Sequence, residues 1–135
     1  MLLDISHARI VHLEWETKLE DILSGRRRPV KVSTHNECML GSWLYIEGIK
    51  KYNHIPEVMR LEQIHVTFHS LAQQVINNHA HRRDGSADEL FKEVKLLSRE
   101  IIYLLTKIEQ HVIHRKKRIN IVRHPIKALS NLFNS

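Results

Sequence analysis

The sequence of 135 residues predicts an all-α protein, namely an antiparallel four-helix bundle with a basic C-terminal extension. Apolar residues recur every three or four positions along four segments, which is the period of a helix with one buried face. The chain has only 4 glycines and 3 prolines, and no long strand-like alternation. Short connections between the segments favour antiparallel neighbours. We expect the bundle to occupy residues 1–114 and the extension residues 115–135.

The first helix is predicted over about residues 3–24. Its apolar stripe consists of Ile5, Ala8, His12, Trp15, Leu19 and Ile22. His12 stands in the middle of this stripe, where a simple core would place a leucine. A lone histidine in a core is more often hydrogen-bonded there than bound to a metal. Gly25 and Pro29 then predict the end of the helix, by C-cap glycine and proline chemistry.

The second helix is predicted over about residues 38–52, with Asn36 as its N-cap. Cys38 then lies in the first turn, where free backbone N–H groups lower the pKa of a thiol and favour the thiolate. Gly41 follows one turn later. Because glycine destabilises a helix, Gly41 predicts the close approach of a neighbouring helix or of a bound metal, or else a simple packing position.

The third helix is predicted from Pro56 to about His81, with His65 on its apolar stripe and His69 on the flank of that stripe. Histidines at i and i+4 project from one face, but with 11 histidines in the chain one such pair is expected by chance. A capping box at residues 86–89 predicts the start of the fourth helix, which should run to about His114. Its stripe contains Leu90, Val94, Leu97, Ile101, Leu104 and Ile108, with no candidate ligand before His111.

One thiolate and three imidazoles are enough to complete a tetrahedral zinc site, and the chain offers them in His12, Cys38, His65 and His69. Catalytic zinc keeps one open position beside an acid or base, whereas four protein ligands leave none. The residues between His65 and His69 also include no carboxylate. Paired Glu-x-x-His motifs, which would predict a di-iron bundle, are missing from the stripes. We therefore expect a metal-binding protein that is not an enzyme.

The single cysteine cannot form an internal disulfide, and no apolar run is long enough for a membrane span. The N-terminus also lacks a secretory signal, so we expect a cytoplasmic protein. Residues 115–135 carry six basic residues and no acidic one, which equals the whole net charge of +6. The charge of the bundle itself therefore predicts no nucleic-acid partner. The extension is either a solvated continuation of the fourth helix or a docking arm for an acidic partner or an anionic membrane surface.

The combined motifs extend beyond the four ligand candidates. They read His12-x-x-Trp15, Cys38-x-Leu40-Gly41-x-Trp43 and His65-x-x-x-His69, and Gly48, Tyr52, Pro56-Glu57, Leu61-Glu62 and Phe68 accompany them. Over roughly residues 5–112 the pattern resembles the chemoreceptor zinc-binding domain family. The resemblance implies a helical bundle, often a homodimer, that binds one zinc ion through the matching His12, Cys38, His65 and His69.

The resemblance also implies a sensory module of the kind attached to cytoplasmic chemoreceptors or diguanylate cyclases. In such modules zinc or oxidants such as hypochlorous acid alter the output. The resemblance thus implies a signalling partner of one of these two types. The printed sequence contains neither a receptor signalling hairpin nor a cyclase domain, so we expect a free-standing version or a fragment. Two hypotheses stay open: a sensory or regulatory zinc domain, and a structural zinc site in an interaction module without switching.

Overall fold

The computed structural model describes residues 3–123, and their side chains up to His114. The regular elements among these residues are all helices, with no strand, which confirms the predicted class. Three long helices dominate: α1 (Ile5–Leu23), α4 (Pro56–Ala80) and α5 (Asp84–Arg123). Between α1 and α4 the chain forms three short elements, α2 (Met39–Trp43), the π-helical turn η1 (Leu44–Gly48) and α3 (Ile49–Tyr52). Within residues 3–123 no helix is both long and apolar enough to span a membrane.

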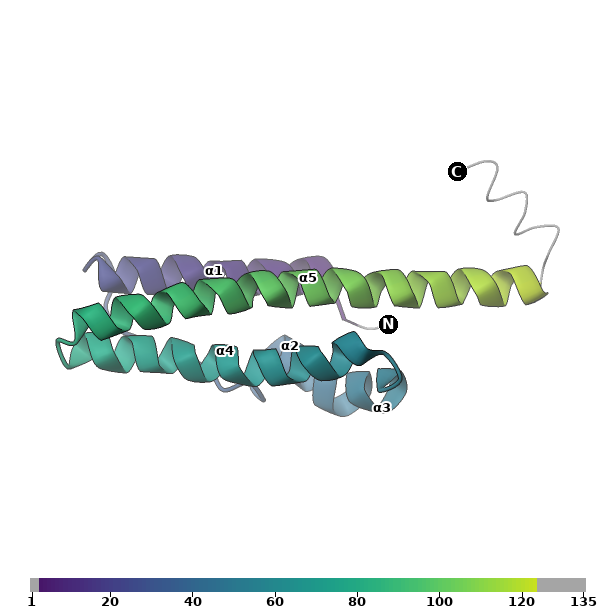
Figure 1. The fold of residues 1–135 in the computed structure, drawn as a ribbon, viewed down its shortest axis with the longest axis horizontal. Coiled ribbons are helices and arrows are strands. Elements are labelled where there is room, and N and C mark those ends of the chain that lie inside the picture. Colours follow the sequence, from purple (N-terminus) through teal and green to yellow (C-terminus); the bar gives the residue numbers. More distant parts are fainter. Residues whose placement is uncertain (1–2, 124–135) are drawn as a thin grey trace.

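The long helices lie side by side, with α5 packed against both α1 and α4 (Figure 1). The chain reverses direction from α1 to the short elements, again to α4, and again to α5 (Figure 1). These contacts are compatible with the antiparallel bundle that the sequence predicts. The predicted second helix is confirmed, because α2, η1 and α3 follow one another without a gap over residues 39–52, and the difference from expectation is the π-helical turn in its middle.

The ends of α1 and α4 follow local chemistry that the sequence displays. Asp4 caps α1 by accepting a hydrogen bond from the backbone N–H of His7. Gly25, just past the end of α1, has a φ of 80°, which a glycine adopts without steric cost. Pro56 occupies the first turn of α4, where its missing N–H leaves no helical bond unmade. The predicted stripe of α1 is confirmed, since all six of its residues are buried.

The predicted start of the fourth helix is wrong, whereas its continuation beyond His114 is one of the two possibilities that the sequence left open for the extension. The helix α5 begins at Asp84, so the supposed cap Ser86 lies inside the first turn, and the N–H of Ala87 already bonds to the carbonyl of Arg83. The Ser86 hydroxyl accepts a hydrogen bond from Asn78 of α4. At its other end α5 continues through the basic run to Arg123. Residues 124–135, which include most of the predicted amphipathic tail, lie outside the described range.

Four of the six residues predicted for the stripe of α5 are buried, namely Val94, Ile101, Leu104 and Ile108. Leu90 and Leu97 are only half-buried, whereas Phe91, Ser98 and Leu105 are buried in addition. The wider buried face follows from packing, because α5 contacts both α1 and α4. One consequence is a buried serine that the apolar pattern did not reveal.

Candidate metal centre

The four residues singled out by the sequence come together at one point of the core. One potential donor atom from each of His12, Cys38, His65 and His69 lies within 4.8 Å of all the others. The helix α1 supplies His12, α4 supplies both His65 and His69, and Cys38 stands immediately before α2. All three imidazoles are buried, and Cys38 is half-buried. Three separate elements therefore meet at a single group of donor atoms.

Two of the three histidines are oriented by backbone carbonyls. Nδ1 of His12 lies 2.7 Å from the carbonyl oxygen of Ala8, and Nδ1 of His69 lies 2.7 Å from that of Ser33. A carbonyl can only accept, so each Nδ1 carries a proton, and the Nε2 of each neutral ring keeps its lone pair. This is how metal-binding histidines are commonly held, with the second nitrogen donating to a backbone or carboxylate oxygen.

His65 lies between the other donors. Its Nε2 is 2.9 Å from Nε2 of His69 and 3.1 Å from Sγ of Cys38. Its ring makes edge contacts with the rings of His12 and His69, with centroids 5.3 and 4.5 Å apart. Nδ1 of His65 is buried and has no hydrogen-bond partner among the described residues. Unlike the other two imidazoles, His65 is thus not fixed by a carbonyl.

Cys38 itself is the N-cap of α2, which corrects the expectation that Asn36 has this role. Its Sγ accepts from the backbone N–H of Gly41 at 3.4 Å. Gly41 does make a close approach, but to neither a helix nor a metal. A Cβ at this position would lie 1.5 Å from the carbonyl oxygen of His35, so the backbone of the preceding loop requires the glycine. The loop and the start of α2 are therefore pressed together beside the thiol.

Burial determines the protonation of the cluster. It lowers the pKa of His12 to about 4, although the hydrogen bond to Ala8 partly opposes the shift. Burial and the neighbouring imidazoles lower the pKa of His65 to about 2, and burial likewise lowers the pKa of His69. All three rings are thus neutral near pH 7, as metal binding requires.

The thiol departs from expectation. Burial raises the pKa of Cys38, and this outweighs the opposing hydrogen bonds from Gly41 and Leu40. Desolvation of the charged form therefore dominates over the helix terminus on which the sequence argument relied. Without a cation in the cluster the side chain is a neutral thiol at pH 7. A bound metal reverses this, because a coordinated thiol loses its proton.

The donor set fits zinc. Borderline-soft Zn²⁺ binds thiolate and imidazole at about 2.3 and 2.0–2.1 Å, which places neighbouring donors of a tetrahedral site roughly 3.3–3.6 Å apart. The Nε2–Nε2 and Sγ–Nε2 contacts of His65 are a few tenths of an ångström shorter than this. Small side-chain shifts are therefore sufficient for coordination. The buried Nε2 of His12, which has no partner among the described residues, supplies a further lone pair.

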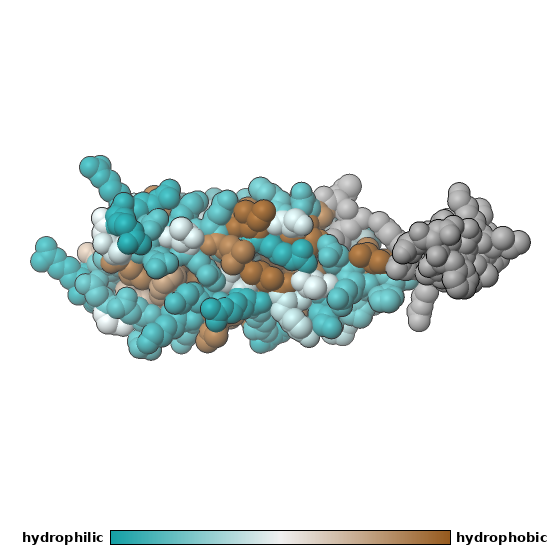
Figure 2. All heavy atoms as spheres, turned by 90° about the horizontal axis from the view of Figure 1, so that it is seen from above, coloured by the Kyte–Doolittle hydropathy of each residue, from teal (hydrophilic) through white to brown (hydrophobic). Residues whose placement is uncertain are grey.

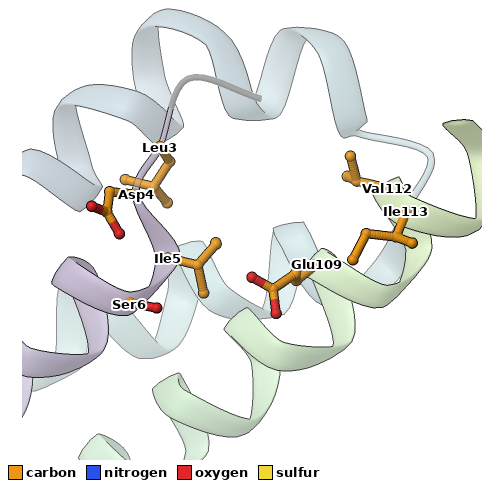
Figure 3. A pocket seen from close by; sticks show the side chains of 7 residues that line it. All are labelled: Leu3, Asp4, Ile5, Ser6, Glu109, Val112 and Ile113. Carbon is orange, nitrogen blue, oxygen red and sulfur yellow. The ribbon is translucent and has the colours of Figure 1, made fainter. Parts of the chain in front are cut away.

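Other histidines of the chain lie away from the cluster. His7 is exposed, His79 pairs with Asp84 at 2.9 Å, and His111 lies 3.4 Å from Glu57 on the surface. An open pocket of about 310 Å³ lies between the N-terminal end of α1 and α5 (Figure 3). It is lined by Leu3, Asp4, Ile5, Ser6, Glu109, Val112 and Ile113. Ile5 is two helical turns before His12, so this pocket is separate from the cluster.

Comparison with known proteins agrees with the geometry. Residues 12–76 match the model of the chemoreceptor zinc-binding domain family. The matched segment begins at His12 and contains the other three members of the cluster. No curated protein and no solved structure matches the chain.

Proposed function

We propose that this chain, in which residues 12–76 belong to the chemoreceptor zinc-binding domain family, binds one zinc ion through His12, Cys38, His65 and His69 and uses it as a regulatory element. The observation that carries the proposal is the meeting of four donor atoms from three elements within 4.8 Å. When bound, zinc supplies a fixed positive charge that joins these elements. A change at the site therefore alters the packing of α1, α4 and the start of α2 together.

The signal can be zinc itself or an oxidant, because Cys38 is the only thiol in the chain. Hypochlorous acid oxidises a thiolate to the sulfenic acid and is itself reduced to chloride. The sulfenic acid is a weaker, neutral ligand, so the three imidazoles then hold the metal less tightly. A shift in helix packing is sufficient as output, and the bundle need not unfold.

The primary test is the metal content of the purified chain, for which we expect one zinc per chain. Stoichiometric hypochlorite should then add one oxygen to Cys38, measured by mass, and release zinc to a chromogenic chelator over the same time course. If the chain keeps its zinc and Cys38 stays a thiol, an oxidant is not the signal, and zinc availability is the signal that remains. A chain that binds no zinc contradicts the whole proposal.

The alternative is a structural zinc site without switching. The burial of all three imidazoles favours it, because buried ligands exchange slowly. Exchange of the bound metal with isotopically labelled zinc separates the two hypotheses, since a sensor must exchange or release metal within minutes. Under either one we propose no catalytic role, because four protein ligands close a tetrahedral site.

The proposed partners are a second copy of the chain and a signalling protein of the chemoreceptor or diguanylate cyclase type, in the cytoplasm. Apolar side chains gather near the middle of the face formed by α1 and α5 (Figure 2). The exposed apolar side chains of these helices include Ile10, Leu13, Leu96 and Tyr103. Such an area supports an interface between proteins. Molar mass in solution, compared between the natural chain and Leu13→Glu/Tyr103→Glu, tests the homodimer.

A further inference from the structure

Ser98 is an unexplained polar residue in the core. The buried polar side chains of the described part are the three cluster histidines and Ser98, which is 0% exposed. The Ser98 hydroxyl oxygen has no hydrogen-bond partner, and neither does Nδ1 of His65. A buried polar group without a partner destabilises a fold by about 1–3 kcal/mol. Because both groups lie in the same core, we asked whether each could be the hydrogen-bond partner of the other.

The register of the α4–α5 hairpin places these two groups at one level. Asn78 bonds to Ser86 at 3.2 Å near the turn, and Arg60 bonds to Glu100 at 3.0 Å further along. His65 and Ser98 both lie between these two cross-links, and Ser98 is two residues before Glu100. The two residues are thus within about one helical turn of each other along the bundle axis.

Both residues also belong to the core faces of their helices. Ser98 shares its stripe with Val94 and Ile101, which are fully buried, and His65 shares its stripe with the fully buried Leu61. Since α4 and α5 pack directly on each other, both stripes point into the same core. Level and face together place Ser98 and His65, the one cluster histidine that no carbonyl holds, on neighbouring core faces of α5 and α4.

The hydrogen bonds of the cluster determine where His65 keeps its proton. Nε2 of His69 presents a lone pair, because its Nδ1 donates to the Ser33 carbonyl. Nε2 of His65 lies 2.9 Å from Nε2 of His69, so a hydrogen bond between them in the metal-free chain places the proton on Nε2 of His65 and leaves its Nδ1 bare. Coordination requires the opposite, a bare Nε2 and a protonated Nδ1. His65 therefore holds one proton in both states, on different nitrogens.

We propose that Ser98 is the positioning residue of His65, and that its hydroxyl pairs with Nδ1 in both tautomers, through one buried water or after a change of its side-chain rotamer. The hydroxyl donates to the bare Nδ1 in the metal-free chain and accepts from Nδ1–H in the zinc-bound chain. This proposal rests on the proposed zinc site. A serine hydroxyl can reverse its role in this way, whereas a backbone carbonyl or a carboxylate only accepts.

Glu16 is the competing partner. It lies one turn after His12 on α1, and its Oε1 is buried without a hydrogen-bond partner. A carboxylate can accept from Nδ1–H in the zinc-bound state, but it has no proton to donate to a bare Nδ1. Glu16 would thus favour the same tautomer in both states. The two candidates differ in what they predict for the metal-free chain.

The tautomers can be read from long-range ¹H–¹⁵N spectra of the imidazole rings. In the natural chain we expect His65 to be protonated on Nε2 without metal and on Nδ1 with zinc, while His12 and His69 stay protonated on Nδ1. In Ser98→Ala the zinc-bound Nδ1–H of His65 should exchange with solvent at least tenfold faster. Zinc affinity should fall 10–100-fold, as for other partners that orient a ligand.

Two variants serve as controls. Val94→Ala removes volume from the same stripe one turn away, so it should lower the melting temperature and leave the His65 resonances unchanged. Glu16→Gln should leave both the exchange rate and the zinc affinity unchanged. An unaltered His65 signal and affinity in Ser98→Ala overturns the proposal, as does the effect appearing in Glu16→Gln. Absence of zinc binding by the natural chain would instead contradict the proposed function.

Discussion

The hairpin of α4 and α5 and the segment from residue 31 to residue 52 contribute to the same cluster in different ways. The hairpin presents His65 and His69 from the interior of a 25-residue helix that packs along α5. The segment presents Cys38 from the residue before the helical stretch 39–52, which follows a loop and contains a π-helical turn. A helix of this length is only marginally stable alone, because nucleation is costly. The position of the thiol thus depends on tertiary contacts.

Those contacts combine apolar packing, in which Leu40, Trp43 and Leu44 are buried in the core, with specific hydrogen bonds. The loop is tied to α4 where the N–H of Val32 donates to Gln73 and where His69 donates to the Ser33 carbonyl. Beyond the thiol, Tyr45 donates to Glu62 of α4 at 2.8 Å. The comparison shows one region that folds by its own periodicity and another held in place by its neighbours and, as proposed, by zinc. Four experiments test whether the two regions differ in this way.

The largest expected effect comes from removing two ligands. In Cys38→Ala/His65→Ala we expect zinc content to fall close to zero and the unfolding free energy to drop by at least about 3 kcal/mol. This is a fraction of the roughly 10–16 kcal/mol that structural zinc supplies in small domains. Metal analysis and urea titration measure both quantities. The exposed His7→Ala is the control, and full zinc occupancy in the double variant contradicts the ligand assignment.

The next effect concerns the backbone contact beside the thiol. Gly41→Ala should destabilise the protein by about 1–3 kcal/mol, because the new Cβ collides with the His35 carbonyl and backbone must move. Gly85→Ala is the matched control in the first turn of α5. A Cβ there meets nothing within 4 Å, so we expect a gain of about 0.4–1 kcal/mol. Equal effects of the two substitutions would show that the loop yields freely.

A third experiment follows the stability of the metal-free chain with pH. Burial lowers the pKa of His12 to about 4 in the folded state, and it also lowers that of His65 and His69. The unfolded chain, with histidine pKa values near 6.5, binds protons that the folded chain excludes. The contribution of the three neutral rings to the unfolding free energy should therefore be almost fully present above about pH 7. The unfolding free energy should fall by roughly 1–2 kcal/mol between pH 7 and pH 6.

His12→Leu provides the control for this titration. The substitution keeps an apolar side chain in the α1 stripe and removes one titrating group, so the slope of stability against pH should decrease. Denaturant titrations at several pH values, with a chelator present, give both slopes. A metal-free chain whose stability is constant between pH 7 and pH 5 would contradict neutral burial of the three rings.

The smallest effect is local. Chelation of zinc should increase hydrogen exchange in residues 39–52 by about tenfold, which corresponds to about 1.4 kcal/mol of local opening. The amides of α4 and α5 that lie away from the cluster should change less, because their helices remain packed on each other. A uniform increase over all helices would show that the segment and the hairpin form one cooperative unit.

The sequence by itself determined the three long helices and the membership of the cluster. The apolar stripes of α1 and α4 are periodic over many turns, so their faces can be read without knowledge of the neighbours. The signals at Asp4, Gly25 and Pro56 act within a few residues, and the ends of these helices follow them. Spacing and residue type brought out His12, Cys38, His65 and His69, since few residue types bind zinc.

Features that depend on two elements at once required the assembled fold. Cys38 became the cap of α2 in place of Asn36, and burial overcame the helix terminus in setting its thiol pKa. The core face of α5 includes Ser98 beside the predicted stripe because α5 packs against both α1 and α4. The carbonyls that orient the two histidines differ in the same way. Ala8 lies four residues before His12 on the same helix, whereas Ser33 lies thirty-six residues before His69 and reaches it only in the folded chain. Periodicity and capping act within a few residues, whereas desolvation and hydrogen bonds across elements require the assembled fold.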